Sequence, residues 1–243
     1  MDFYLEIMIY LSIIIPAYNE ANRIGPTLDA ISEYLKQRDF TYEIIVVDDG
    51  STDQSVSVIE KYRLLFSNFI SLKNEKNRGK GYSVKRGMLS ACGEYRLFMD
   101  ADHSVKIDNF DNFLNETKKG ADIVIGSIEL PGSEIKDNNQ WYRRILGKMS
   151  KKLIQFVIAP GIYDTQRGFK LFTKKSIDII FPKQTITRWG FDIELITIAI
   201  QHNLKIKEVP VIWLNGKDSS VGVGAYLTTF AELVKIKINS WQG

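Results

Sequence analysis

The chain has 243 residues, of which 44% are hydrophobic and 25% charged, which fits one globular domain with a full core. Its single cysteine excludes an internal disulfide framework and a metal site built from several cysteines. The net charge is +3, but segment 136–175 carries ten Lys or Arg residues against two acids, which indicates an anionic partner for that segment.

Strands and helices are predicted to alternate through the first half of the chain. Apolar, largely β-branched runs predict strands at 11–15, 43–47, 69–73, 95–99 and 121–125. Helical spacing of apolar residues predicts helices at 20–37, 53–66, 81–91 and 107–118. This alternation is typical of an α/β fold with a largely parallel sheet and helices on both faces. No internal repeat or low-complexity linker interrupts it, so we predict a single domain over 1–243.

The N-terminal segment shows no evident signal peptide. Its apolar run at 7–15 is interrupted by Ser12 and ends at Pro16, so it is far too short for a membrane span of about 20 residues. We therefore expect a cytoplasmic protein without a transmembrane helix.

Acids and turn residues follow three of the predicted strands, at 16–20, 48–53 and 100–102. In open α/β sheets the ligand lies at the carboxyl ends of the strands, so these segments are expected to meet at one site. The first turn lacks the Gly-x-Gly-x-x-Gly spacing, so the dinucleotide fingerprint of a dehydrogenase is absent.

Asp100 and Asp102 end an apolar strand and are separated by Ala101. Alternation along an extended chain places both carboxylates on the same side. Oxygen ligands in this arrangement suit a hard divalent cation, and Mg²⁺ takes only one or two carboxylates beside substrate phosphates. The alternative is a solvated loop in which two acids occur by chance.

Asp48 and Asp49 follow the second predicted strand. Adjacent carboxylates repel each other, so turn formation alone does not explain the pair. A ribose or a base, which offers hydroxyl and N–H donors, would use them. The alternative is a plain turn in which Ser51 or Asp53 caps the next helix.

The segment 77–81, Asn-Arg-Gly-Lys-Gly, opens a predicted helix with two glycines and two cations. Glycines let the backbone approach a ligand, and the N–H groups at a helix start favour phosphate. Beside the Asp-Ala-Asp segment this pattern indicates a site for a metal and a diphosphate. A flexible basic turn is the alternative.

Six motifs in this order resemble the inverting family 2 glycosyltransferases of the GT-A fold. They are Pro-x-Tyr-Asn-Glu at 16–20, Val-Asp-Asp-Gly-Ser-x-Asp at 47–53, Asn-x-Gly-Lys-Gly at 77–81, Asp-Ala-Asp at 100–102, and the segments 164–172 and 188–195. The last two segments resemble the branch that glycosylates dolichyl phosphate, and its glucosyl type more than its mannosyl type. The resemblance implies a Rossmann-like, mostly parallel sheet, with a nucleotide-sugar half at 1–126 and an acceptor half at 127–243.

The resemblance also implies the donor site. The residues expected to bind the nucleotide sugar are Pro16, Tyr18, Glu20, Asp48, Asp49, Lys80 and Asp100. Asp100 and Asp102 are expected to bind Mg²⁺ or Mn²⁺ bridging the diphosphate, and Asp102 is thereby placed among the catalytic residues. Similar enzymes often carry a Gln ligand where this chain has Ser104, which leaves a third protein ligand in doubt.

On the acceptor side, Arg143 matches a position where related enzymes carry an arginine for the lipid phosphate. A second such arginine usually follows the Gly-Ser at 126–127, but here that residue is Ile128. Arg144, Lys148 and Arg167 are the candidates to replace it.

Residues 143–158 have an apolar stripe opposite a basic one. We favour a helix that packs on the core with a solvated basic face; the alternative is an interfacial helix on anionic lipid. The region lacks the interleaved aromatics and the motif of an RNA reader, so nucleic acid is not the expected partner. We expect peripheral contact with the cytoplasmic face of a membrane instead.

The resulting prediction is metal-dependent transfer of a hexose, with inversion, to a polyprenyl or dolichyl phosphate. UDP-glucose is the favoured donor and GDP-mannose the second. A phosphate monoester is mostly ionised at pH 7, so a strong general base is not required. Asp192 and Asp164 are the candidates if one is used. The alternatives are transfer to a hydroxyl of a cell-surface glycan, and a catalytically silent module that binds nucleotide sugar or membrane.

Overall fold

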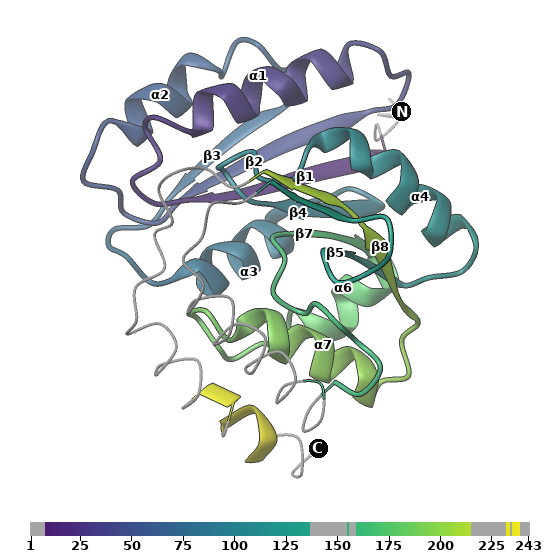
Figure 1. The fold of residues 1–243 in the computed structure, drawn as a ribbon. Helices are drawn as coiled ribbons and strands as arrows, with labels where there is room; N and C mark the ends of the chain where they lie inside the picture. Colours follow the sequence, from purple (N-terminus) through teal and green to yellow (C-terminus); the bar gives the residue numbers. More distant parts are fainter. Residues whose placement is uncertain (1–7, 137–154, 156–158, 215–231, 234, 239–243) are drawn as a thin grey trace, which may run out of the picture.

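The computed structural model describes residues 8–136, 155, 159–214, 232–233 and 235–238 (Figure 1). Its main sheet has seven strands in the order β3-β2-β1-β4-β7-β5-β8. They are β1 Leu11–Ala17, β2 Tyr42–Asp48, β3 Phe69–Lys73, β4 Tyr95–Met99, β5 Ile123–Ser127, β7 Phe169–Thr173 and β8 Ile206–Pro210. A second sheet pairs β6 Glu134–Lys136 with β9 Ile212–Leu214 in parallel.

Helices cover both faces of the main sheet (Figure 1). They are α1 Ile24–Leu35, α2 Ser55–Lys61, α3 Lys80–Ser90, α4 Phe110–Lys118, α6 Lys174–Ile180 and α7 Phe191–Gln201, with a 3₁₀ turn at Ile107–Asn109. One core cluster joins alternate residues of β1 to α1 and α4. The other joins the opposite face of the sheet to α3, α6 and α7. The predicted α/β fold is therefore confirmed.

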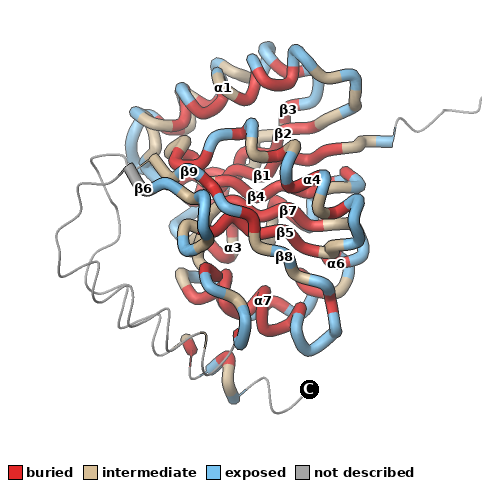
Figure 2. The backbone as a smooth tube through the Cα atoms, turned by 45° about the vertical axis from the view of Figure 1, so that its right-hand side comes forward, coloured by how far each residue is buried: buried red, intermediate tan, exposed pale blue. Residues whose placement is uncertain are grey.

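The central strands are buried on both faces, as Figure 2 shows by their colour. All seven residues of β1 are buried, including Ile13, Ile14 and Ile15 with no exposed surface. A strand between two helical layers has no solvent face, so it is largely apolar and lacks polar alternation. The polar residue in β1, Ser12, is buried and its hydroxyl donates to Glu43 Oε1 at 2.6 Å. Burial of these runs supplies the main favourable free energy of folding, at about 25 cal/mol per Å² of apolar surface.

β7 is the exception to the predicted parallel sheet. It runs antiparallel between β4 and β5, whereas the other neighbouring strands described in the main sheet pair in parallel. The register pairs Met99 with Phe169 and Phe98 with Lys170. Because β7 runs in the opposite direction, it begins at the edge where β4 ends, and the Asp100 N–H donates to the Gly168 carbonyl at 2.9 Å. The segment before β7 is thus brought beside Asp100.

Two predicted helices are shorter in the structure. The helix expected at 20–37 begins at Ile24, because residues 20–23 form a turn in which the N–H groups of Arg23 and Ile24 donate to the Glu20 carbonyl at 2.9 Å. The helix expected at 53–66 covers only Ser55–Lys61. Among the described residues no helix has the length and apolarity needed to cross a membrane.

Candidate active site

Polar side chains gather where β1, β2 and β4 end and β7 begins. The loop after β1 and the loop after β2 are joined by hydrogen bonds. The Asn19 N–H donates to Ser51 Oγ at 2.9 Å, and the Thr52 N–H donates to Asn19 Oδ1 at 2.9 Å. Asn19 has a φ of 54°, a left-handed conformation that Asn tolerates better than most residues. The predicted convergence of the strand ends is therefore present in the structure.

Asp49 holds the loop that leads into α3. Its buried carboxylate accepts hydrogen bonds from the Asn74 amide at 2.7 Å, the Arg78 N–H at 2.9 Å and the Gly79 N–H at 2.8 Å. Gly79 has a φ of 103°, and a Cβ there would overlap the Thr187 carbonyl. Asp49 thus fixes the start of α3, and its contact with a nucleotide stays a prediction.

Asp48 has a more local role. It is buried at the end of β2, and its carboxylate accepts the Ser51 N–H at 3.2 Å and 3.4 Å from its two oxygens. Turn formation therefore accounts for part of the Asp48–Asp49 pair. Among the other expected nucleotide-binding residues, Pro16 is buried in β1, whereas Tyr18 is 42% exposed at the strand end.

Glu20 lies in the loop after β1 and forms an ion pair with Arg23, with 2.6 Å between Arg23 Nε and Glu20 Oε2. The pKa of Glu20 is raised to about 7, chiefly by burial, while Arg23 opposes this shift and the charges of Asp102 and Asp100 add to it. The electrostatic coupling shows that these three carboxylates share one region of negative potential.

Asp100 and Asp102 are only partly buried, and Lys80 lies beside Asp100. The Nζ of Lys80, the first residue of α3, is 2.5 Å from Asp100 Oδ1. Asp102 Oδ1 accepts the Ser104 N–H at 3.0 Å. Burial lowers the pKa of Lys80, but the charges of Asp100, Asp192 and Asp102 together raise it further, so the ammonium is retained.

The donor set fits a divalent cation that is completed by substrate oxygens. No group of three or more His, Cys, Asp or Glu side chains in the described part of the chain could hold a metal ion. Two carboxylates are enough for Mg²⁺ only where water or phosphate oxygens complete the coordination, so a metal at Asp100 and Asp102 stays a prediction. A Cβ at Gly168 would overlap the Asp100 carboxylate, so a glycine leaves room for this acid. Ser104, at the doubtful third position, is buried and its carbonyl accepts the Leu214 N–H at 2.8 Å.

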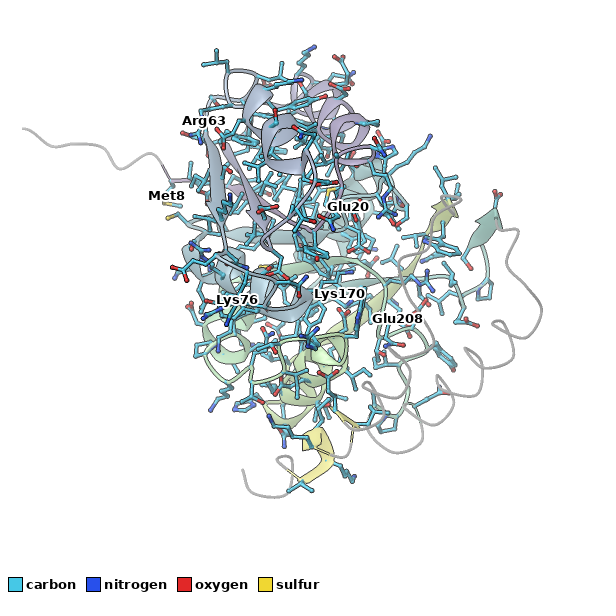
Figure 3. All side chains as sticks on the ribbon, turned by 90° about the vertical axis from the view of Figure 1, so that its left-hand side faces the viewer. Met8, Glu20, Arg63, Lys76, Lys170 and Glu208 are labelled. Carbon is cyan, nitrogen blue, oxygen red and sulfur yellow. The ribbon has the colours of Figure 1, made fainter. Side chains whose placement is uncertain are left out.

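A buried ion pair lies next to this group. Lys170 of β7 has no exposed surface, and its Nζ is 2.5 Å from Asp192 Oδ1 near the start of α7. The same ammonium donates to the Arg167 carbonyl. Burial raises the pKa of Asp192 and exceeds the lowering effect of Lys170 and Lys80. In Figure 3, Lys170 is labelled near the middle of the molecule, below Glu20 and to the left of Glu208.

Asp164 and Arg167 form a second pair before β7. Arg167 Nε lies 2.9 Å from Asp164 Oδ2, and that oxygen also accepts the Ile128 N–H at 3.3 Å. The guanidinium lies 4.7 Å from the centroid of the Trp213 ring. Glu208 of β8 fixes this turn by accepting the Asp164 N–H at 2.9 Å. Arg143, Arg144 and Lys148 lie outside the described residues.

Lys170, Glu208 and Trp213 are among the residues of this site that were not predicted from the sequence. Lys170 offered one signal, since a lysine inside the apolar run 169–172 requires a buried partner. Nothing in the sequence pairs it with Asp192, which is 22 residues away. Glu208 and Trp213 carry no local pattern that points to this turn.

Comparisons with known proteins agree with this geometry. Residues 12–181 match the profile of glycosyl transferase family 2. A dolichyl-phosphate beta-glucosyltransferase of Trichomonas vaginalis is 38% identical over 241 residues, which cover 95% of this chain and 71% of that protein. A dolichyl-phosphate beta-glucosyltransferase of Homo sapiens is 36% identical over 218 residues, which cover 84% of this chain and 67% of that protein.

Solved structures show the same fold at low sequence identity. Mannosyl-3-phosphoglycerate synthase from Rubrobacter xylanophilus aligns with a TM-score of 0.71 and 17% identity, over 93% of this chain and 74% of that one. Glucosyl-3-phosphoglycerate synthase from Mycobacterium tuberculosis, in complex with Mn²⁺, UDP and glucosyl-3-phosphoglycerate, aligns with a TM-score of 0.69 and 16% identity, over 95% of this chain and 79% of that one. These alignments confirm the GT-A type of α/β fold.

Proposed function

This chain is a glycosyltransferase that belongs to glycosyl transferase family 2, and we propose that it transfers glucose from UDP-glucose to a polyprenyl phosphate of the dolichyl class. The observation that carries the proposal is the placement of Asp100, Asp102 and Lys80 at the end of β4 and the start of α3. The relatives named dolichyl-phosphate beta-glucosyltransferases support the choice of sugar and acceptor.

The donor diphosphate would bind at this group. Asp100 and Asp102 would hold Mg²⁺ or Mn²⁺, which supplies positive charge to the leaving diphosphate. Lys80 adds a cation beside the same carboxylates. The start of α3 would favour phosphate because the helix dipole is positive at that end, with the N–H groups of Lys80 and Gly81 nearest; the Tyr82 N–H already donates to the Thr187 carbonyl at 3.0 Å. The nucleoside would extend toward the loops after β1 and β2, where Tyr18 is exposed.

The acceptor phosphate would attack the anomeric carbon from the face opposite the diphosphate. A phosphate oxygen forms the new bond to this carbon while the bond from the carbon to the diphosphate oxygen breaks, so the configuration inverts. A phosphate monoester is mostly ionised at pH 7 and needs no strong base. Both candidate bases are ion-paired, Asp192 with Lys170 and Asp164 with Arg167. These pairings favour a phosphate acceptor over a hydroxyl one.

Among the residues that the structure describes, Arg167 is the candidate for binding the acceptor phosphate. It lies before β7, next to Asp164 and against Trp213. Arg143 and Arg144 remain predictions for the same role, as does peripheral contact of their segment with an anionic membrane surface. This basic segment would keep the acceptor phosphate near the donor while the lipid chain stays in the membrane.

The proposal is tested by incubating the protein with polyprenyl phosphate, Mn²⁺ or Mg²⁺, and one of three labelled donors: UDP-glucose, GDP-mannose or UDP-N-acetylglucosamine. We expect label in the organic phase from UDP-glucose only. Label from GDP-mannose alone would mean that the protein transfers mannose and not glucose. Donor hydrolysis without organic-phase label would favour a hydroxyl acceptor, and neither reaction would favour a silent binding module.

A further inference from the structure

Lys80 occupies the coordination space next to Asp100. Its Nζ lies 2.5 Å from Asp100 Oδ1, and the two side chains are 21% and 24% exposed. A divalent cation that approaches this oxygen therefore meets an ammonium group already in contact with it. Two cations cannot share one carboxylate oxygen without strong repulsion, because the partly buried position weakens solvent screening.

Asp100 lies against the turn before β7. Its carboxylate is so close to Gly168 that a single Cβ on that residue would overlap it. The Asp100 N–H also donates to the Gly168 carbonyl at 2.9 Å. The strand end and the turn before β7 thus hold the backbone of Asp100 and limit the space around its carboxylate. Lys80 is the partner that can move, since it has a flexible four-carbon stem.

The ammonium of Lys80 also has alternative neighbours when it moves. It lies 5.4 Å from the centroid of Phe98 and 5.6 Å from that of Trp189, where an aromatic face attracts a cation. Asp102, in the turn after β4, and Asp192, in α7, add negative potential. Lys80 can therefore leave Asp100 and remain in a favourable environment at the start of α3.

We propose that Lys80 is an exchangeable counter-ion of Asp100, which the divalent cation displaces and which then contacts the donor diphosphate. This inference rests on the proposed metal site at Asp100 and Asp102. It predicts that metal alone binds weakly, because binding must break the Lys80–Asp100 ion pair. Metal and nucleotide then bind cooperatively, because the diphosphate provides the displaced ammonium with a new partner.

The test is a titration of the protein with Mn²⁺ followed by electron paramagnetic resonance, with and without UDP. Lys80→Met removes the ammonium, and Lys80→Gln removes the charge but keeps a hydrogen-bond donor. Lys61→Met makes the same change in net charge on an exposed residue of α2, away from the strand ends. Circular dichroism confirms that each variant is folded.

Without UDP, we expect both Lys80 variants to bind Mn²⁺ about tenfold more tightly than the wild type and Lys61→Met. Adding UDP should raise the Mn²⁺ affinity of the wild type far more than that of the Lys80 variants. If the wild type and the Lys80 variants bind Mn²⁺ equally well without UDP, and all of them bind it with UDP, the role of Lys80 is wrong but the proposed metal site stands. Absence of Mn²⁺ binding by every protein under both conditions would overturn the metal site of the proposed function as well.

Discussion

The side of the site that we propose for the donor and the side that we propose for the acceptor use charge differently. On the donor side, Lys80 and Asp100 are paired but each remains between a fifth and a quarter exposed. On the acceptor side, Lys170 is fully buried and Asp192 almost so, and each is the other's partner. A charged side chain within reach of solvent can exchange its ion-pair partner for a ligand. A buried ion pair instead holds two parts of the chain together. Substitutions should therefore separate catalysis from stability.

The largest effect is expected on the donor side. Asp102→Asn should lower sugar transfer by about 10³-fold, because it removes a negative ligand from the proposed metal site. The free energy of unfolding should change by less than about 0.5 kcal/mol, since the Asp102 side chain is only partly buried. Transfer kinetics and urea unfolding of the same protein measure the two effects.

Asp108→Asn is the matched control, because Asp108 is exposed in the following 3₁₀ turn and lies outside the site. It should retain both activity and stability. Full activity of Asp102→Asn would remove this acid from the donor site, and a large loss of stability would erase the proposed distinction between the two sides.

Lys170→Met should instead reduce the free energy of unfolding by about 3–5 kcal/mol, because it leaves the buried Asp192 charge without a partner. Lys174→Met is the control: its ion pair with Asp178 is exposed, and its loss should cost under about 1 kcal/mol. The double variant Lys170→Met/Asp192→Leu should recover part of the stability. Urea unfolding measures all three, and wild-type stability of Lys170→Met would contradict a structural role for the pair.

Gly168→Ala acts on the junction of the two sides. The new Cβ would displace the Asp100 carboxylate, so the Mn²⁺ concentration needed for half-maximal activity should rise about tenfold, with a stability loss of about 1–3 kcal/mol. Gly25→Ala, in α1, has ordinary room for a Cβ apart from the Tyr62 hydroxyl at 3.3 Å and should leave the Mn²⁺ requirement unchanged. If Gly168→Ala needs the same Mn²⁺ concentration as the wild type, the space beside the Asp100 carboxylate is not required for activity.

The smallest effect is a pH dependence at Glu20. Its pKa is raised from 4.5 to about 7 in the folded protein, chiefly by burial. The folded state therefore binds the proton more tightly, so the stability contribution is complete below pH 4.5 and is lost as the pH rises toward 7. Between pH 5 and pH 8 the wild type should lose about 1–2 kcal/mol relative to Glu20→Gln, allowing for solvent screening. Urea unfolding at both pH values measures this difference. A stability difference between the wild type and Glu20→Gln that is the same at pH 5 and pH 8 would contradict the raised pKa.

The donor side could be predicted from the sequence because its signals are local. Strand 95–99 was predicted with the observed bounds, and Asp100 and Asp102 follow it directly, separated by a single residue. The acceptor side depends on a long-range pairing. β7 enters the sheet antiparallel, and an alternating pattern of strands and helices gives no information about that direction.

The same limit applies to individual residues. The contact of Asp49 with the nucleotide stays a prediction, but the sequence did not indicate that its carboxylate also holds the loop before α3, because the donors are 25 to 30 positions away. The helix at 20–37 was predicted too long because its apolar spacing does not reveal the turn that Glu20 makes before Ile24. Roles of Arg143 and Arg144 stay predictions.

The central claim is that a lipid phosphate, and not a hydroxyl, accepts the sugar. The most direct measurement compares polyprenyl phosphate with polyprenol of the same chain length, using labelled UDP-glucose and Mn²⁺. We predict organic-phase label with polyprenyl phosphate and none with polyprenol. Label on polyprenol, or no label on polyprenyl phosphate from a protein that hydrolyses UDP-glucose, would contradict the account.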